Sequence, residues 1–283
     1  PPSFRQIAER LAAHDALLFV GGRGLRTTLY SVAKFPQKKA WLGHNAAAQP
    51  PAGRFELERV ADLRDSLSRV RALLAPGNEK HAIKSRRPEL ALPAPRAKLH
   101  PTRAMHALLE RFRDAIWVDE SGLSTSDVRQ WMSLEAGEYL INGSGGIGWG
   151  LAAAVGAAIA QPKRQVVAVI GDGSALYASE ALWTAGHHGA KLLLVVLSNR
   201  RYATLNEAAS RLAGGPLRAF TIEPPVIDFS GLATLYGFRY RAAATERALT
   251  AFLGKIRGRV HANTLLELKL DPGVKPVTAS RHF

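Results

Sequence analysis

The sequence has 283 residues, of which 47% are hydrophobic and 22% charged, proportions that are typical of a folded protein of one or two domains. It contains no cysteine, which excludes disulfide bonds and thiolate catalysis, and it shows no apolar run of membrane-spanning length and no signal-peptide pattern, so we expect a cytoplasmic protein without membrane contact. The formal net charge of +15 raises the question of a nucleic-acid partner, but the 38 Lys and Arg residues are scattered, and we predict no specific nucleic-acid binding.

Residues 1–75 predict a partial α/β domain. The apolar spacing favours a helix over Phe4–Leu11, a strand over Ala16–Val20 and a second helix over Val60–Leu74. The glycines of residues 21–24 lack the full GxGxxG spacing of a dinucleotide-binding turn, so we do not interpret them as one.

Residues 76–100 predict a linker. This segment contains Pro76, Pro88, Pro93 and Pro95 among several lysines and arginines, and proline interrupts both helices and strands. We therefore expect a basic, proline-rich connection to the larger C-terminal domain.

Residues 101–283 predict a doubly wound, mostly parallel sheet with helices on both faces. Apolar segments suited to buried strands alternate with amphipathic segments suited to helices, one of which covers residues 174–185 with Ser179 as a possible cap. The expected strands are Ala115–Val118, Val166–Ile170, Lys191–Leu197, Phe238–Tyr240 and Thr264–Leu270.

Two polar residues follow neighbouring strands of this sheet. Gly171, Asp172 and Gly173 directly follow the strand 166–170, and Asn199 comes 27 residues after Asp172, at the end of the next strand. In a strand-helix-strand unit the carboxyl ends of both strands lie at the same edge, where open α/β sheets bind ligands. A carboxylate and an amide oxygen are ligands that Mg²⁺ prefers, so the spacing predicts a magnesium site next to a phosphate group.

The same segments resemble the signature of thiamine-diphosphate-dependent enzymes, Gly-Asp-Gly-Ser followed by a helix, a strand and Asn-Asn. Here the last pair is Ser198-Asn199, which changes the first asparagine and keeps the second, the metal ligand of the family. The amino-acid sequence of residues 171–185 and 199–205 is most similar to the benzoylformate decarboxylase branch.

The resemblance implies a role for each matching position. The Asp172 and Asn199 side chains and the Arg201 main-chain oxygen would bind the metal, and Ile147 would be the bulky wedge that bends the cofactor. The other implied cofactor-binding residues are Gly145, Gly146, Gly171, Gly173, Ser174, Tyr177 and Tyr202.

Several of these side chains have an alternative structural interpretation. Tyr177 and Tyr202 could be core aromatics. Ser121, Ser124 and Thr125 could line the phosphate end of the site or cap the next helix. His187 and His188 lie near a helix end, where a cation is favourable without any catalytic role.

The resemblance also implies that part of the site lies outside this chain. Members of the family take an activating glutamate from a pyrimidine-binding domain, for which we find no counterpart here. Glu120 follows a strand of the diphosphate domain, so we do not assign it that role, and we assign no catalytic residue. The substrate-binding histidine of the decarboxylase branch has no counterpart in residues 21–30 either.

The resemblance therefore implies a decarboxylase of a 2-oxo acid that uses thiamine diphosphate and Mg²⁺. It would act as a homo-oligomer, or as a hetero-oligomer with a separate pyrimidine-binding half. Two alternatives remain open: a carboligase of the acetolactate synthase type, and a non-catalytic protein that retains the fold.

Overall fold

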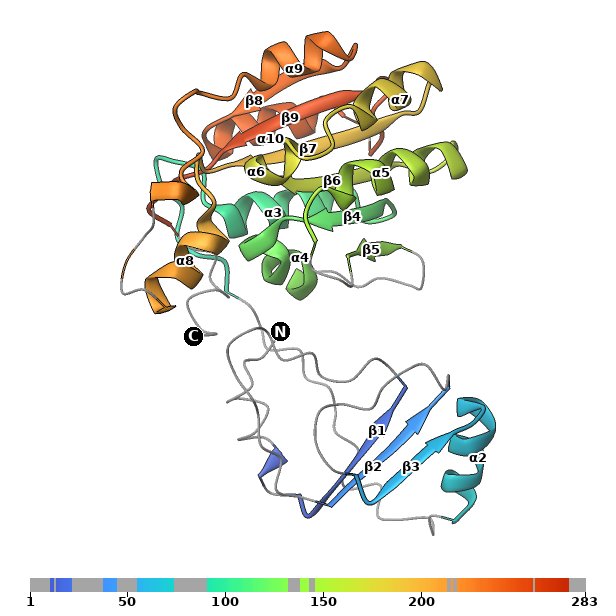
Figure 1. The fold of residues 1–283 in the computed structure, drawn as a ribbon. Coiled ribbons are helices and arrows are strands. Elements are labelled where there is room, and N and C mark those ends of the chain that lie inside the picture. Colours follow the sequence, from blue (N-terminus) through green and yellow to red (C-terminus); the bar gives the residue numbers. More distant parts are fainter. Residues whose placement is uncertain are drawn as a thin grey trace. The chain divides into compact units, whose positions relative to one another are not determined.

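The computed structural model describes residues 11–12, 14–21, 38–44, 55–73, 91–131, 138–142, 146–212, 215, 218–256 and 258–274. The chain divides into two compact units, Pro1–Glu89 and Leu90–Arg281 (Figure 1). None of the helices in the described part of the chain is long and apolar enough to cross a membrane.

The first unit contains a parallel three-stranded sheet in the order β1-β2-β3, formed by Ala16–Val20, Lys38–Gly43 and Leu57–Val60. Helix α2, Leu63–Leu73, follows β3. The expected helix over Val60–Leu74 therefore begins later, because Val60 ends a strand. Of the helix expected over Phe4–Leu11, only Leu11 lies among the described residues.

The second unit is built on a six-stranded sheet in the order β5-β4-β6-β7-β9-β8, in which all paired strands are parallel. Its strands are β4 Ile116–Glu120, β5 Tyr139–Ile141, β6 Val166–Gly171, β7 Leu192–Ser198, β8 Arg239–Ala243 and β9 Thr264–Lys269. Its helices are α3 Pro101–Arg111, α4 Thr125–Trp131, α5 Trp149–Ala160, α6 Asp172–Ala175, α7 Ala181–His187, α8 Ala203–Leu212, α9 Phe229–Leu235 and α10 Glu246–Gly254, with short 3₁₀ helices at Gly122–Ser124 and Arg218–Phe220.

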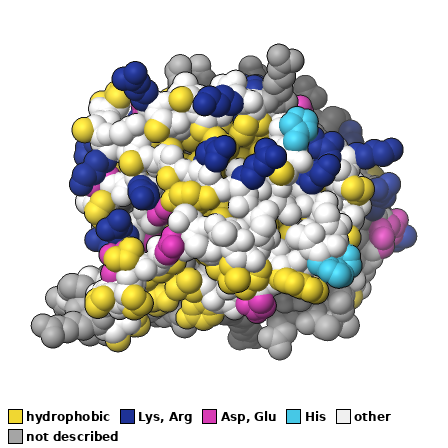
Figure 2. Space-filling view, turned by 90° about the horizontal axis from the view of Figure 1, so that it is seen from above, with side chains coloured by type: hydrophobic (Ala, Val, Ile, Leu, Met, Phe, Trp, Pro, Cys, Tyr) yellow, Lys and Arg dark blue, Asp and Glu magenta, His cyan; other side chains and the backbone are white. Residues whose placement is uncertain are grey.

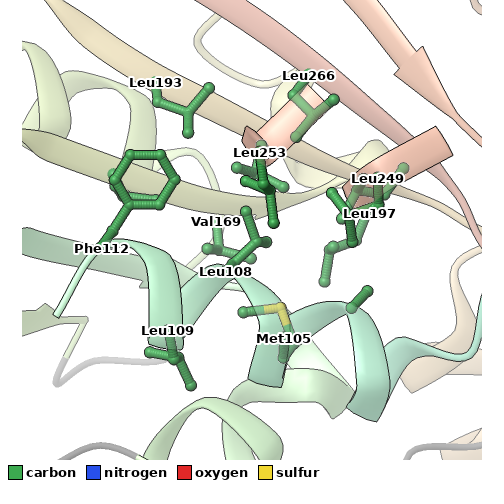
Figure 3. Packing of buried hydrophobic residues seen from close by; sticks show 14 of the residues in the cluster. Met105, Leu108, Leu109, Phe112, Val169, Leu193, Leu197, Leu249, Leu253 and Leu266 are labelled. Carbon is green, nitrogen blue, oxygen red and sulfur yellow. The ribbon is translucent and has the colours of Figure 1, made fainter. Parts of the chain in front are cut away.

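Both faces of this sheet are covered, which confirms the predicted doubly wound α/β fold. Alternate residues of β6 point to opposite faces, as in any strand. Val167 and Val169 pack with α3 and α10, in a layer that Figure 3 shows from close by, with Leu108 and Leu253 facing the sheet. Val166, Ala168 and Ile170 belong to a second cluster with α5, α7 and α9. Because both faces are apolar, β6 and β7 read as continuous hydrophobic runs.

The helix expected over residues 174–185 is interrupted. Helix α6 ends at Ala175, and α7 begins at Ala181 with Glu180 at its cap position, so Ser179 is not the cap. Leu182 is fully buried, whereas Leu176 and Trp183 are exposed. The apolar spacing correctly indicated helical structure, but the chain leaves the helix after one turn at the carboxyl end of β6.

Part of the predicted linker is described. Leu99 is fully buried and forms a parallel bridge with Leu270, and His100 accepts a hydrogen bond from the Thr102 backbone N–H at the start of α3. Residues 76–90 lie outside the described residues, so the predicted linker boundaries stay a prediction.

Charged side chains are spread over the face of the protein that Figure 2 shows. Lys and Arg side chains alternate there with apolar and uncharged ones. On this face the basic side chains are distributed in the same scattered way as along the sequence.

Candidate functional site

The carboxyl ends of β4, β6 and β7 form one side of a cavity of about 1010 Å³. The parallel register places Glu120 beside Ile170 and Gly171 beside Leu197, so these three strands end at the same level. Ligand pockets of small molecules and cofactors have volumes of several hundred to about 1,000 Å³. The cavity is therefore large enough for a cofactor.

Asp172 lies at the wall of this cavity and is only 3% exposed. Its Oδ2 accepts hydrogen bonds from the backbone N–H groups of Asn199 at 2.9 Å and Arg200 at 2.6 Å, and its Oδ1 accepts one from Gly173 at 2.8 Å. The ends of β6 and β7 thus meet at this carboxylate.

Burial raises the pKa of Asp172 to about 6, and the three backbone hydrogen bonds only partly oppose that shift. No ion pair between described residues includes Asp172. A buried carboxylate without a cationic partner is costly, and a metal ion would relieve that cost.

The turn after β7 carries two further residues with oxygen atoms that line the same cavity, Asn199 and Arg201. The Asn199 Oδ1 accepts a hydrogen bond from the Arg201 N–H at 3.1 Å, and the Arg201 carbonyl oxygen accepts one from the Ala203 N–H at 2.8 Å. Arg200 has a φ of 61°, a left-handed conformation that is uncommon outside glycine. A carboxylate, an amide oxygen and a main-chain carbonyl form the oxygen-only donor set that suits Mg²⁺.

Gly173 lines the cavity next to the Tyr202 ring. A Cβ atom at this position would lie 2.3 Å from Cε1 of the Tyr202 ring, so only glycine fits. Gly171, Ser174 and Tyr202 line the cavity as well. Burial raises the pKa of Tyr202, and the neighbouring Tyr177 and Asp172 raise it further.

Tyr177 is 58% exposed and is therefore not a core aromatic, and because it does not line the cavity its contact with a cofactor stays a prediction. Its Cβ packs against Gly148, where an added Cβ would lie 2.9 Å away. Tyr177 therefore supports the loop that follows Ile147.

The loop that the sequence predicts for the other end of the cofactor lies on the same cavity. Gly146 and Ile147 line it, and the Ile147 side chain is 46% exposed. Gly145 lies outside the described residues.

The sequence did not reveal how Glu120 is used. Its Oε1 accepts a hydrogen bond from the Gly148 N–H at 2.6 Å, and its Oε2 accepts one from the Gly150 N–H. The sequence contains a signal for this contact. Glu120 is an acidic residue at a strand end, Gly148-Trp149-Gly150 begins a later helix, and helix N-termini favour acidic groups.

A second carboxylate network lies at the carboxyl end of β4. The buried Asp119 accepts hydrogen bonds from the Ser121 hydroxyl at 2.5 Å, from the Thr125 hydroxyl at 3.3 Å and from the Tyr139 hydroxyl at 2.5 Å. Ser121, Ser124 and Thr125 line the cavity, while the Ser121 side chain makes no capping hydrogen bond to the helix that follows it.

Comparison with known proteins shows which protein family contains this site. Residues 120–262 match the thiamine pyrophosphate enzyme family, in its C-terminal TPP binding domain. The chain belongs to this family. The matched segment begins at Glu120 and includes both Asp172 and Asn199.

Individual relatives agree with this assignment. The chain is 39% identical to benzoylformate decarboxylase of Pseudomonas aeruginosa over 142 residues, which are 50% of this chain and 26% of that protein. It is 28% identical over 180 residues to acetolactate synthase isozyme 1 large subunit of Escherichia coli, covering 59% of this chain and 32% of the relative.

Among solved structures, the thiamine diphosphate-dependent 4-hydroxybenzoylformate decarboxylase of Rhodococcus jostii RHA1 superposes with a TM-score of 0.75 at 30% identity, over 96% of this chain and 52% of that one. The chain therefore spans about half of this relative and a smaller share of the two curated enzymes. The resemblance to the benzoylformate decarboxylase branch that the sequence indicated is confirmed.

Proposed function

We propose that this chain binds thiamine diphosphate together with Mg²⁺ and forms the cofactor-binding part of an enzyme that decarboxylates a 2-oxo acid to an aldehyde and carbon dioxide. The similarity to benzoylformate decarboxylase supports this reaction class. The chemistry that bound thiamine diphosphate supplies is a carbon nucleophile for the 2-oxo group and an acceptor for the electrons released with carbon dioxide.

One observation carries the proposal. A carboxylate that is 3% exposed lies beside Asn199 at the wall of a cavity of about 1010 Å³, with no cationic partner among the described residues. The charge of a buried carboxylate needs a compensating partner, and a cation bound in the cavity would provide one. A ligand ion therefore fits the arrangement.

The residues of the chain would then hold the cofactor at two points. Asp172, Asn199 and the Arg201 carbonyl would bind Mg²⁺, and Gly171, Gly173, Ser174 and Tyr202 would surround the diphosphate. Gly145, Gly146 and Ile147 would hold the aminopyrimidine, with Ile147 as the wedge beneath the cofactor, and Tyr177 would act through the loop that it supports.

We assign none of these residues to the activation of the aminopyrimidine. We propose that this step depends on a glutamate from a pyrimidine-binding half, either in the same polypeptide or in a partner subunit, so that the active protein is a homo-oligomer or a hetero-oligomer. A cytoplasmic location and a small 2-oxo acid substrate belong to the same proposal.

Calorimetric titration with thiamine diphosphate and Mg²⁺ tests the binding step. The chain should bind the cofactor only when Mg²⁺ is present, and Asp172→Ala should abolish this metal-dependent affinity. Binding of equal strength with and without Mg²⁺ would contradict the proposed role of Asp172, and no binding at all would leave a protein that retains only the fold.

Ile147→Ala tests the wedge. In the presence of the pyrimidine-binding half, the substitution should reduce turnover more than cofactor affinity, because the wedge acts on the shape of the bound cofactor. Equal losses in both would argue against this role.

A carboligase reaction is the second candidate, favoured by the similarity to acetolactate synthase. Both reactions use the same cofactor site, so the residues described above do not separate them. Product analysis with pyruvate does: a decarboxylase yields acetaldehyde, and a carboligase yields acetolactate.

A further inference from the structure

Glu120 connects two parts of the cavity that the proposed function uses separately. It is the last residue of β4, and its neighbour in the register of the sheet is Ile170, two residues before Asp172. Its carboxylate spans from this strand end to the start of α5, where it accepts hydrogen bonds from Gly148 and Gly150. The segment that these bonds fix comes directly after Ile147.

The contact is built for a carboxylate at this position. An added Cβ at Gly150 would lie 2.7 Å from Oε2 of Glu120 and 2.5 Å from Cδ1 of Ile170, so glycine is required for the approach. Gly148 adopts a φ of 93°, which turns the chain into α5. The N-terminus of this 12-residue helix favours a negative charge, and no side chain of its own cap residue supplies one.

We propose that Glu120 is a positioning residue that holds the Ile147 loop at a fixed place relative to the Asp172 site. The residues that bind the two ends of thiamine diphosphate would then be preorganised before the cofactor binds. This inference rests on the proposed function and extends it to Glu120, a cavity-lining residue to which the proposed function assigns no contact with the metal or the diphosphate. Glu120 acts through the backbone of residues 148–150.

The expected effect follows from preorganisation. When a binding-competent conformation is populated only in part, the apparent affinity falls by that fraction. A glutamine at position 120 has nearly the same size but no charge, and its amide group directs N–H atoms at one of the two backbone donors. The loop should then leave its place for part of the time, while the Asp172 site stays intact.

Two ligands test the two ends of the site separately. Magnesium thiamine diphosphate uses both ends, whereas magnesium with inorganic diphosphate uses only the Asp172 end. In calorimetric titrations, Glu120→Gln should weaken thiamine diphosphate about tenfold, as for a loop that is competent about one tenth of the time, and leave inorganic diphosphate within about twofold of the unsubstituted chain.

Thr245→Ala is the matched control. Thr245 caps α10 by accepting a hydrogen bond from the Ala248 N–H at 3.2 Å, on a helix that does not line the cavity. Its loss should lower the unfolding temperature, as the loss of a helix cap does, and leave the affinity for both ligands unchanged.

Gly148→Ala is a second substitution that should displace the Ile147 loop, and it leaves Glu120 unchanged. A Cβ at this position would lie 2.9 Å from the Tyr177 Cβ, on a backbone conformation that suits glycine. This variant should show the same selective loss of thiamine diphosphate affinity, with a folded circular dichroism spectrum.

The outcomes are distinct. If Glu120→Gln left thiamine diphosphate affinity unchanged, or reduced the affinity for both ligands alike, Glu120 would have a general structural role and the inference would be wrong. If the unsubstituted chain bound neither ligand, the proposed function itself would fail, and the inference with it.

Discussion

The ionisation of Asp172 gives the sharpest test of the site in the absence of metal. Burial raises the pKa of this carboxyl group from 3.8 to about 6. Between these two values the folded protein binds more protons than the unfolded chain, so the stability of the metal-free protein falls as the pH rises through this range. Above about pH 6 the full cost of the buried charge remains.

The size of the effect follows from the two pKa values. Between about pH 5 and about pH 7.5, ionisation of Asp172 should lower the free energy of unfolding by about 1.4 kcal/mol. Asp172→Asn removes the titrating group, so the variant should gain about that much stability relative to the unsubstituted chain over the same interval.

Urea denaturation with a metal chelator present measures this difference. Tryptophan fluorescence reports on the larger unit, because four of the five tryptophans lie in it. Asp114→Asn, at an exposed aspartate, is the control and should show a constant difference at both pH values. A constant difference for Asp172→Asn as well would refute the argument that burial without a cation destabilises this carboxylate.

Two further substitutions, Gly173→Ala and Arg200→Gly, test the backbone around the site, and Gly156→Ala is the control for the first. Gly173→Ala should destabilise the protein by about 1–3 kcal/mol through overpacking against the Tyr202 ring, whereas Gly156→Ala, in an exposed helical position with nothing within 4 Å, should stabilise it slightly in the same thermal unfolding experiment. Equal effects would mean that the ring moves away at little cost. Arg200→Gly should raise the urea midpoint, because it relieves the left-handed conformation and loses only a partly exposed ion pair with Glu223 at 3.6 Å; a lower midpoint would show that this ion pair outweighs the backbone strain.

The sheet could be predicted because its signal is local. Strands buried on both faces require uninterrupted apolar residues, and Val166–Gly171 and Leu192–Ser198 show that pattern without ambiguity. The meeting of Asp172 and Asn199 followed from this, since parallel neighbours end at one edge of the sheet.

The interruption after α6 could not be predicted from spacing. Leu176, Leu182 and Trp183 have helical spacing, but only Leu182 is buried. Periodicity reports which residues are apolar and leaves open whether the sheet, a ligand or a partner covers them. The exposure of Ile147 and Tyr177 could not be predicted for the same reason. The sequence shows that these side chains are large and largely apolar, but it does not show what they contact.

The two carboxylates at neighbouring strand ends show why chemical type alone does not identify a ligand site. Glu120 ends a buried strand, Asp172 directly follows another, and both accept backbone hydrogen bonds. The partners of Glu120 belong to the first residues of α5, whose partial positive charge a carboxylate balances. The partners of Asp172 lie in the turn after β7 and, for one of its oxygen atoms, at its own neighbour Gly173, and burial still raises its pKa to about 6. The fold itself therefore compensates Glu120, whereas the raised pKa of Asp172 supports the proposal that a bound cation compensates that carboxylate.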